Sequence, residues 1–253
     1  MQKAVEIKHD GLTLRGMVHI PEKNKVRYPF IIMFHGFSAQ RCEAQFMFVK
    51  LSRELEKEGI GSARFDFIGS GESDGCFKDM TVSSELNDAK TIFNFVRSLD
   101  YVDEENLFIL GMSMGGLVAS LFAPETNKLK GLVLWAPAGS MMQLIVRIIH
   151  ENRKYIMPDG TIDICGNILS KDFIDDLGRF DIYRKAAEYK GHVLIIHGTE
   201  DQDIPLHTAN CYKNAYEHSE VILVKDADHA FSRYLWKKEL IISTVSFIKN
   251  SCN

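Results

Sequence analysis

Two serines of this chain lie at the centre of the pattern Gly-x-Ser-x-Gly, which is typical of nucleophilic serines. One is Ser113 in the stretch GMSMG, and the other is Ser73 in the stretch GESDG. A serine nucleophile needs a strand that ends abruptly, a tight turn that exposes the hydroxyl, and a helix that begins at once. The apolar segment LFIL precedes Gly111 and the helix-compatible segment GGLVASLFA follows Ser113, whereas Ser73 lies in a polar, turn-rich segment. The flanking residues therefore favour Ser113 and make Ser73 a chance match.

A serine hydroxyl reacts only when a base removes its proton, and that base needs a carboxylate to orient it. Among nine histidines, His229 is favoured because it follows the apolar segment VILV and precedes the last helical segment. Loops at the carboxyl edge of a parallel sheet commonly carry the chemistry of the protein. The loop after VLIIHG supplies the carboxylate, with Asp201 favoured and Asp203 as the alternative. The chain order serine, acid, histidine is the one expected for a nucleophile in a strand–turn–helix segment.

The segments that must position these residues alternate between strand and helix patterns. Two alternating segments open the chain, KAVEIKH and LTLRGMVHI, and the residues His9-Asp10-Gly11 between them predict a β-hairpin. Short apolar segments of the kind found in parallel strands then follow; they are FIIMF, GSARFDF, LFIL, LVLW, VLII and VILV. Apolar residues at helical spacing lie between or after them, for example at 82–96 and 240–248. The alternation predicts an α/β fold with a mostly parallel eight-stranded sheet and helices on both faces.

One connection between strands is much longer than a crossover helix requires. Trp135 and His192 lie 57 positions apart, although a crossover needs only about a dozen residues. The surplus contains the apolar helical segment MMQLIVRIIH, the turn PDG at 158–160, and the segments TIDICGNIL and KDFIDDLGRF. We therefore expect a single domain at 1–253 with a small cap inserted at about 137–185. A covering cap of this kind typically shapes a substrate pocket.

The composition argues against several classes of protein. The formal net charge of 253 residues is −4 without long runs of like charge, so nothing indicates a nucleic-acid partner. No apolar segment is long enough to span a bilayer, and the first residues lack the apolar block of a signal peptide, so we expect a cytoplasmic location. The five cysteines share no close spacing, and we expect neither a disulfide framework nor a metal site. The glycines at 69–75 do not fit the dinucleotide pattern, so no nucleotide cofactor is expected.

The chain resembles the α/β-hydrolase superfamily along nearly its whole length. The similar segments are HGF at 35–37, FDFIGSGESDG, GMSMGG, HGTEDQDIP and DADHAF. Within the superfamily it looks most like small bacterial serine esterases of the cinnamoyl (feruloyl) esterase group, on the stretch DFIGSGESDGCFKDMT and the hairpin-bearing cap. The resemblance implies that Asp201 is the acid of a triad with Ser113 and His229. It also implies an oxyanion hole formed by the backbone N–H groups of Phe37 and Met114.

These residues predict a serine hydrolase that acts on carboxylic esters through an acyl-enzyme intermediate and needs no cofactor. The resemblance implies hydroxycinnamate esters, or other small aryl or short-chain acyl esters, as the small-molecule substrates. The same residues would also serve a monoacylglycerol-type lipase, a thioesterase or a small serine peptidase. A protein of this fold that binds a ligand without catalysis is the alternative from a different class. The edge strands and the last helix leave room for a homodimer.

Overall fold

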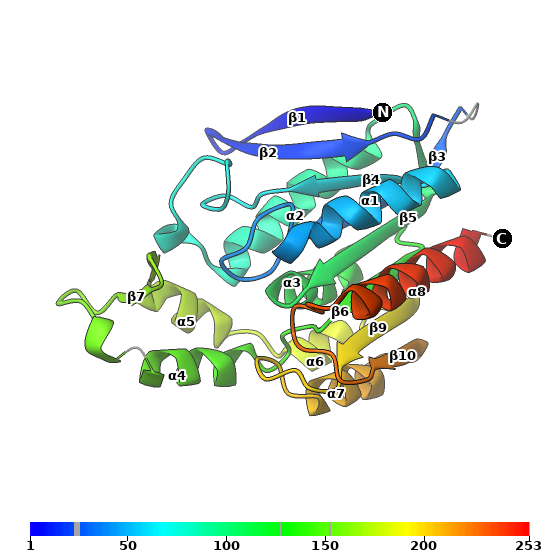
Figure 1. The fold of residues 1–253 in the computed structure, drawn as a ribbon. Helices are drawn as coiled ribbons and strands as arrows, with labels where there is room; N and C mark the ends of the chain where they lie inside the picture. The colour runs from blue at the N-terminus through cyan, green and yellow to red at the C-terminus, as the bar shows by residue number, and fades with distance from the viewer. Residues whose placement is uncertain (23–25, 127, 152, 253) are drawn as a thin grey trace.

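The computed structural model describes residues 1–22, 26–126, 128–151 and 153–252, so one residue of the predicted cap and the last residue of the predicted domain lie outside it. The main sheet has eight strands in the order β1-β2-β4-β3-β5-β6-β9-β10 (Figure 1). Their bounds are β1 (Gln2–His9), β2 (Leu12–His19), β3 (Tyr28–Phe34), β4 (Gly61–Phe65), β5 (Val102–Met112), β6 (Gly131–Trp135), β9 (His192–Gly198) and β10 (Ser219–Val224). Neighbouring strands from β4 to β10 are parallel, and β2 is antiparallel to both β1 and β4. The predicted α/β fold with a mostly parallel eight-stranded sheet is confirmed.

The hairpin of β1 and β2 forms one edge of the sheet. His9 pairs with Leu12, so Asp10 and Gly11 alone form the turn. The φ angle is 48° at Asp10 and 81° at Gly11. Positive φ at both central residues is the mark of a type I′ turn, whose twist fits that of the paired strands. Aspartate and glycine tolerate this conformation, which is why the sequence predicted the hairpin correctly.

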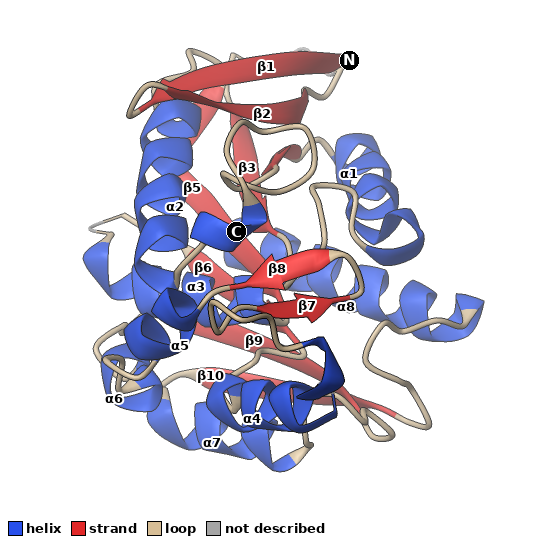
Figure 2. Ribbon diagram, turned by 90° about the vertical axis from the view of Figure 1, so that its left-hand side faces the viewer, coloured by secondary structure: helices blue, strands red, loops and turns tan. Residues whose placement is uncertain are grey.

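Helices cover both faces of the sheet (Figures 1 and 2). The α-helices are α1 (Met47–Glu58), α2 (Val82–Arg97), α3 (Met114–Phe122), α4 (Met141–Glu151), α5 (Lys171–Leu177), α6 (Ile182–Ala186), α7 (His207–Ala215) and α8 (Tyr234–Cys252), and the 3-10 helices are η1 (Ala44–Phe46), η2 (Phe77–Asp79), η3 (Ala123–Glu125) and η4 (Arg153–Tyr155). Helix α1 packs against α8 on one face, and α2 packs against α3 on the other. In the described part of the chain, no helix combines the length and the apolar character that a membrane crossing requires.

The central strands are buried on both faces. In β3, Phe30, Ile32 and Phe34 belong to the apolar core beneath α2 and α3, whereas Ile31 and Met33 belong to the core beneath α1 and α8. All five residues are at most 1% exposed. Successive side chains of a strand point to opposite faces, so a strand between two helical layers has to be apolar throughout. This is the pattern by which the sequence located the strand.

Helix α1 has no counterpart among the predicted elements, although part of its signal is visible. Its buried residues include Met47, Phe48, Leu51 and Leu55, which recur at helical spacing. The helix ends at Gly59, where φ is 81°, and a glycine in this left-handed conformation is a common helix stop. The helix matters for the site because it begins where the loop after β3 ends.

The long connection between β6 and β9 contains α4, η4, α5 and α6 together with β7 (Ile162–Ile164) and β8 (Asn167–Leu169). Figure 1 shows α4, α5 and β7 on the left, beyond the carboxyl ends of the central strands. Strands β7 and β8 pair in antiparallel fashion, and φ is positive at the turn residues Cys165 and Gly166. Arg147 of α4 donates to the carbonyl O of Gln202 at 2.8 Å and of Asp203 at 3.2 Å, in the loop after β9. The part of the connection from α4 to α5, which we call the cap, therefore lies over the sheet edge that carries the candidate residues. Helix α6 instead packs against α3 and α7.

Candidate active site

Ser113 lies in the turn between β5 and α3, at the carboxyl end of a central strand, and is 7% exposed. Its backbone has φ 53° and ψ −117°, and such strained conformations cost on the order of 1–3 kcal/mol and persist only where surrounding contacts hold them. The Ser113 N–H donates to the carbonyl O of Trp135 at 2.9 Å, and its C=O accepts from the N–H groups of Gly116 and Ala138, both at 2.9 Å. These bonds hold a sharp strand-to-helix turn that displays the hydroxyl at the sheet edge.

Three glycines allow the strand, the turn and the helix to approach this closely. A Cβ atom on Gly115 would lie 2.1 Å from the carbonyl O of Phe34, and one on Gly111 would lie 2.1 Å from the carbonyl O of Gly115. A Cβ atom on Gly116 would lie 2.9 Å from the Cβ of Pro137. All three separations are too short for real atoms. The glycines around Ser113 are therefore required by backbone packing.

Ser113, His229 and Asp201 form a continuous chain of hydrogen bonds. His229 Nε2 lies 3.0 Å from Ser113 Oγ, and His229 Nδ1 lies 2.7 Å from Asp201 Oδ2. The other oxygen, Asp201 Oδ1, accepts the N–H groups of Asp203 at 2.9 Å and Ile204 at 2.8 Å. Because a carboxylate only accepts hydrogen bonds, Nδ1 carries the proton and Nε2 can accept the proton of the serine hydroxyl. The structure thus brings together the three side chains that the sequence singled out.

The loop between β10 and α8 holds His229 through contacts on both sides of the histidine. The Asp228 carboxylate accepts the N–H of Ser232 at 2.8 Å, and the Asp228 carbonyl accepts the N–H of Phe231 at 3.1 Å. The Phe231 side chain is fully buried in the core beneath α1 and α8. These contacts place the imidazole over the carboxyl edge of the sheet.

The charges around the imidazole prepare it to accept a proton. Burial acts to raise the pKa of Asp201, but hydrogen bonds from His197 and His229 outweigh it and hold that pKa well below its usual range. His197 Nε2 lies 3.3 Å from Asp201 Oδ2. Burial acts to lower the pKa of His229, but the hydrogen bond and charge of Asp201 raise it, with further contributions from Asp203 and Glu43. An ionised carboxylate beside a basic imidazole is the arrangement that general-base catalysis requires.

Asp203, the alternative acid, has a different environment. Its carboxylate is 58% exposed and lies 3.6 Å from the guanidinium of Arg147 on α4. Asp201, in contrast, has a fully buried side chain that contacts His229 directly. The structure therefore places Asp201, and not Asp203, against the imidazole.

Two backbone amides near Ser113, those of Phe37 and Met114, are bonded to no backbone acceptor in the part of the chain that the structure describes. Met114 is the first residue of α3, and the N–H of a first helical residue has no acceptor within its helix. Phe37 lies in the loop of residues 35–46 between β3 and α1, which we call the oxyanion loop after the role predicted for the Phe37 N–H. This loop contacts the serine, because a Cβ atom on Gly36 would lie 3.3 Å from Ser113 Cβ. Within the described residues no acceptor is bonded to the Phe37 N–H, so both amides can serve an oxyanion.

His35 fixes the peptide group that carries the Phe37 N–H. Its Nε2 accepts the N–H of Phe67 at 3.1 Å, so Nδ1 carries the proton and donates to the Gly36 carbonyl O at 2.9 Å. The same carbonyl accepts the N–H of Ala39 at 3.2 Å. The Gly36 C=O and the Phe37 N–H belong to one planar group, so orienting the first orients the second. Burial lowers the pKa of His35, which keeps the ring neutral.

Ser73, in the second Gly-x-Ser-x-Gly match, stabilises a loop. Its hydroxyl donates to the carbonyl O of Asp66 at 2.6 Å and accepts the N–H of Arg15 at 2.9 Å. The Asp66 carboxylate in turn accepts the N–H of Arg41 at 2.6 Å and of Glu72 at 3.0 Å. Both partners of the Ser73 hydroxyl are backbone groups, which gives this serine a structural role.

A cavity of about 400 Å³ opens in front of Ser113 and His229 and is also lined by the oxyanion loop. The ring of Phe37 packs against Phe77 with ring centres 5.3 Å apart, and against Phe173 of α5 with centres 5.8 Å apart. The oxyanion loop is therefore in direct contact with the cap. A ligand in the cavity would meet the serine on one side and this loop on the other.

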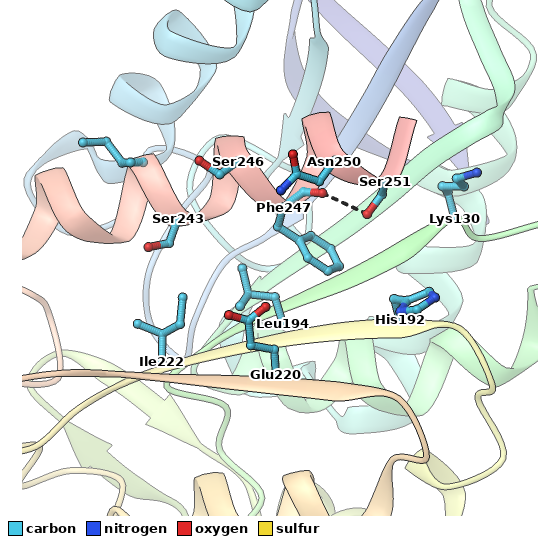
Figure 3. Close-up of a pocket in the computed structure, with 11 residues that line it drawn as sticks. Lys130, His192, Leu194, Glu220, Ile222, Ser243, Ser246, Phe247, Asn250 and Ser251 are labelled. Atoms are coloured by element: carbon cyan, nitrogen blue, oxygen red, sulfur yellow. Dashed lines mark hydrogen bonds between the residues drawn. The ribbon is translucent and has the colours of Figure 1, made fainter. Parts of the chain in front are cut away.

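A second cavity, of about 620 Å³, lies at the amino ends of β9 and β10, the opposite edge of the sheet (Figure 3). His192 and several serines line it, but Figure 3 shows Ser251 bonded to the carbonyl O of Phe247, at 2.8 Å. This cavity shows no serine–histidine pair among the residues drawn. In the part of the chain that the structure describes, no group of three His, Cys, Asp or Glu side chains could hold a metal ion. The candidate active site is therefore the one at Ser113.

The fold and the site together define an α/β hydrolase. The sequence family described as serine aminopeptidase, S33, matches residues 29–185, which is more than half of the chain. The chain belongs to this hydrolase family. The predicted resemblance to the α/β-hydrolase superfamily is confirmed.

One solved structure and two curated relatives are similar to this chain. Est1E from Butyrivibrio proteoclasticus, solved with ferulic acid, superposes with a TM-score of 0.85 at 23% identity, over 98% of this chain and 99% of Est1E. This match shows that the two chains share one fold over almost their whole lengths. The uncharacterised protein YfhR of Salmonella typhi is 30% identical over 195 residues, and the polyketide transferase ATR5 of Stachybotrys chlorohalonatus is 26% identical over 129 residues. These alignments cover 70% and 51% of this chain but only 58% of YfhR and 41% of ATR5.

Proposed function

We propose that this protein is a serine carboxylesterase that hydrolyses carboxylic esters through an acyl-enzyme intermediate. The observation that carries the proposal is the hydrogen-bond chain from Ser113 Oγ to His229 at 3.0 Å and from His229 to Asp201 at 2.7 Å. Two further observations support it. The serine occupies a strained strand-to-helix turn, and among the described residues no backbone acceptor is bonded to the N–H groups of Phe37 and Met114. This combination supplies a nucleophile, a base, an orienting acid and an oxyanion site.

In the first step, Ser113 Oγ attacks the ester carbonyl carbon while His229 Nε2 takes the hydroxyl proton. The carbonyl oxygen becomes an oxyanion and accepts hydrogen bonds from the N–H groups of Phe37 and Met114. When the tetrahedral intermediate collapses, the ester C–O bond breaks and His229 gives its proton to the departing alcohol. Water, deprotonated by the same imidazole, then attacks the acyl carbon; the bond from that carbon to Ser113 Oγ breaks, His229 returns the proton to Oγ, and the acid is released. Asp201 stabilises the imidazolium in both steps.

For the substrate we propose hydroxycinnamate esters or other small aryl or short-chain acyl esters. The fold shared with Est1E, a structure that contains ferulic acid, supports an aromatic acid. The cavity of about 400 Å³ is within the usual range for small-molecule sites. The rings of Phe37, Phe77 and Phe173 form an aromatic cluster beside it.

Two rival reactions use the same acyl-enzyme chemistry. The family is described as serine aminopeptidases, which favours an aminoacyl amide as the rival substrate. ATR5 is named a polyketide transferase, which favours an acyl acceptor other than water. A panel of feruloyl, short-chain acyl, monoglyceride, thioester and aminoacyl substrates, each with and without an added alcohol, separates these reactions. A larger kcat/KM for an aminoacyl anilide than for every ester would show that the protein is a peptidase and not the proposed esterase.

Replacement of Ser113 by alanine tests the proposal. The change removes the nucleophile, and kcat for p-nitrophenyl acetate should fall by on the order of a million-fold, as when one member of a cooperating triad is lost. The matched control is Ser73→Ala in the second Gly-x-Ser-x-Gly segment, which should keep most of its activity. A fluorophosphonate probe should label the wild-type protein and leave Ser113→Ala unlabelled. Near-native hydrolysis by Ser113→Ala would refute the mechanism, and an unlabelled wild type would favour a non-catalytic binding protein.

A further inference from the structure

A buried carboxylate, that of Glu43, lies in the oxyanion loop outside the proposed triad and is 9% exposed. Its Oε1 accepts the N–H of Gly36 at 2.5 Å, and its Oε2 accepts the N–H of Ala44 at 3.0 Å. The Glu43 N–H donates to the carbonyl O of Gln40 at 2.8 Å. Backbone amides of the same loop thus hold the carboxylate. The hydrogen bond from Gly36 to Glu43 closes the segment between these two residues into a compact ring.

Gly36 stands between this carboxylate and the serine. A Cβ atom on Gly36 would lie 3.3 Å from Glu43 Oε1 and also 3.3 Å from Ser113 Cβ. The hydrogen bond from Gly36 to Glu43 therefore sets how closely the loop approaches Ser113. The Phe37 N–H belongs to the next peptide group, whose orientation His35 fixes through the Gly36 carbonyl. His35 thus orients that amide, and Glu43 determines where it lies.

The backbone around Glu43 is strained. The φ angle is 57° at Glu43, 49° at Gln45 and 62° at Phe46. Left-handed conformations of residues other than glycine persist only where the surroundings enforce them. Lys237 of α8 supplies one such contact, because its ammonium donates to the side-chain oxygen of Gln45. The loop is held in a conformation that it would not adopt alone, which makes each anchoring contact important.

We infer that Glu43 is a positioning residue for the oxyanion hole, because its carboxylate holds the Gly36 N–H and thereby sets the Phe37 amide against the reacting carbonyl. The inference rests on the proposed function. The hydrogen bond does the positioning, so a glutamine can take the place of the glutamate. The negative charge has a separate effect: with Asp201 and Asp203, it is one of the charges that raise the pKa of His229.

Three variants test this role through kcat and KM for p-nitrophenyl acetate. An oxyanion donor contributes about 10²–10³ in kcat, and displacement of the Phe37 amide in Glu43→Ala should lower kcat about 10- to 100-fold with little change in KM. Glu43→Gln keeps an acceptor oxygen for the Gly36 N–H and should retain kcat at the pH plateau. In Glu43→Gln the fall of kcat with decreasing pH should occur at lower pH than in the wild type, because the charge that favours protonated His229 is gone. The control is Glu54→Ala, which removes an exposed carboxylate paired with Lys57 on α1 and should leave kcat unchanged.

Inhibition by phenylboronic acid distinguishes positioning from a general structural role, because its tetrahedral serine adduct places an oxygen in the oxyanion hole. The inhibition constant should rise in Glu43→Ala by a factor similar to the loss of kcat and stay unchanged in Glu43→Gln. If melting curves show that Glu43→Ala is unfolded, Glu43→Met, which has similar volume and no acceptor oxygen, replaces it. Wild-type kcat in the alanine or methionine variant, or equal losses in these and the glutamine variant, would overturn the inference. Activity in Ser113→Ala would instead refute the proposed function.

Discussion

Asp201→Asn should remove most of the activity without disturbing the fold. An asparagine oxygen can still accept the N–H groups of Asp203 and Ile204, which Asp201 Oδ1 accepts at 2.9 and 2.8 Å. The new NH₂ group then faces His229 Nδ1, where the carboxylate oxygen lay at 2.7 Å. An NH₂ group is a donor, so it favours the tautomer with the proton on Nε2. In that tautomer the imidazole cannot take the proton of Ser113.

The expected loss is about 10⁴-fold in kcat, the size seen when the equivalent aspartate-to-asparagine change traps the wrong tautomer in a serine protease. It corresponds to about 5 kcal/mol of transition-state free energy. A shift along the pH axis should accompany it. The Asp201 carboxylate raises the pKa of His229 above its ordinary value of 6.5, and in the proposed mechanism the neutral imidazole is the active base. Wild-type kcat/KM should therefore fall with decreasing pH around a midpoint above 6.5, and the residual activity of Asp201→Asn should fall at lower pH.

The assay is kcat/KM for p-nitrophenyl acetate across a range of pH, with Asp203→Asn as the matched control. The Asp203 side chain is 58% exposed and pairs with Arg147 at 3.6 Å. Exposed ion pairs contribute only about 0.2–1 kcal/mol to the free energy of unfolding, so loss of this pair should leave the fold intact. The control should therefore keep most of its activity. A large loss in Asp203→Asn together with a small loss in Asp201→Asn would show that the acid is misassigned. If the residual kcat/KM of Asp201→Asn fell at the same pH as that of the wild type, the electrostatic reasoning would be contradicted.

Two further variants test the packing behind the site. Burial raises the pKa of Asp88 from 3.8 to about 6. The ionised carboxylate therefore destabilises the fold increasingly as the pH rises through this interval. Asp88→Asn, which can still accept the N–H of Ile68, should raise the free energy of unfolding in urea by on the order of 2 kcal/mol at neutral pH and by less in mild acid. An equal gain in unfolding free energy at the two pH values would contradict this prediction. Gly115→Ala brings a Cβ to 2.1 Å from the Phe34 carbonyl O and should lower the free energy of unfolding by at least about 3 kcal/mol. A variant with the same free energy of unfolding as the wild type would show that the turn can relax.

The sheet was predictable because strands buried on both faces must be apolar throughout. Helix α1 was missed for a reason that lies at its start. The residue before it, Phe46, is left-handed and makes no side-chain capping hydrogen bond. Helix starts are recognised in sequences mainly by capping residues such as serine, threonine, aspartate and asparagine. Without that signal, the buried apolar residues of α1 were too few to set it apart from the polar loop that precedes it.

The candidate site divides into residues with local signals and residues without them. Ser113 was identified by the strand and helix on either side of it, and His229 by its place after the last strand. The choice between Asp201 and Asp203 was harder, because both carboxylates lie in one loop. Backbone amides at 203 and 204 turn the first carboxylate inward, and Arg147 of the cap pairs with the second. Only the resemblance to known hydrolases decided this choice in advance.

Glu43 had no local signal at all. Its carboxylate reaches Gly36 because the chain turns back between the two residues, with positive φ at Ser38 and at Glu43 itself. The neighbouring left-handed residue Gln45 is held by Lys237 from the far end of the sequence. On Coulomb grounds, a carboxylate near a developing oxyanion opposes the reaction. The same charge favours the imidazolium of His229, which forms in the same transition state. The two electrostatic effects have opposite signs, and both are absent when position 43 carries glutamine or alanine. The comparison of these two variants therefore isolates the contribution of the hydrogen bond to Gly36.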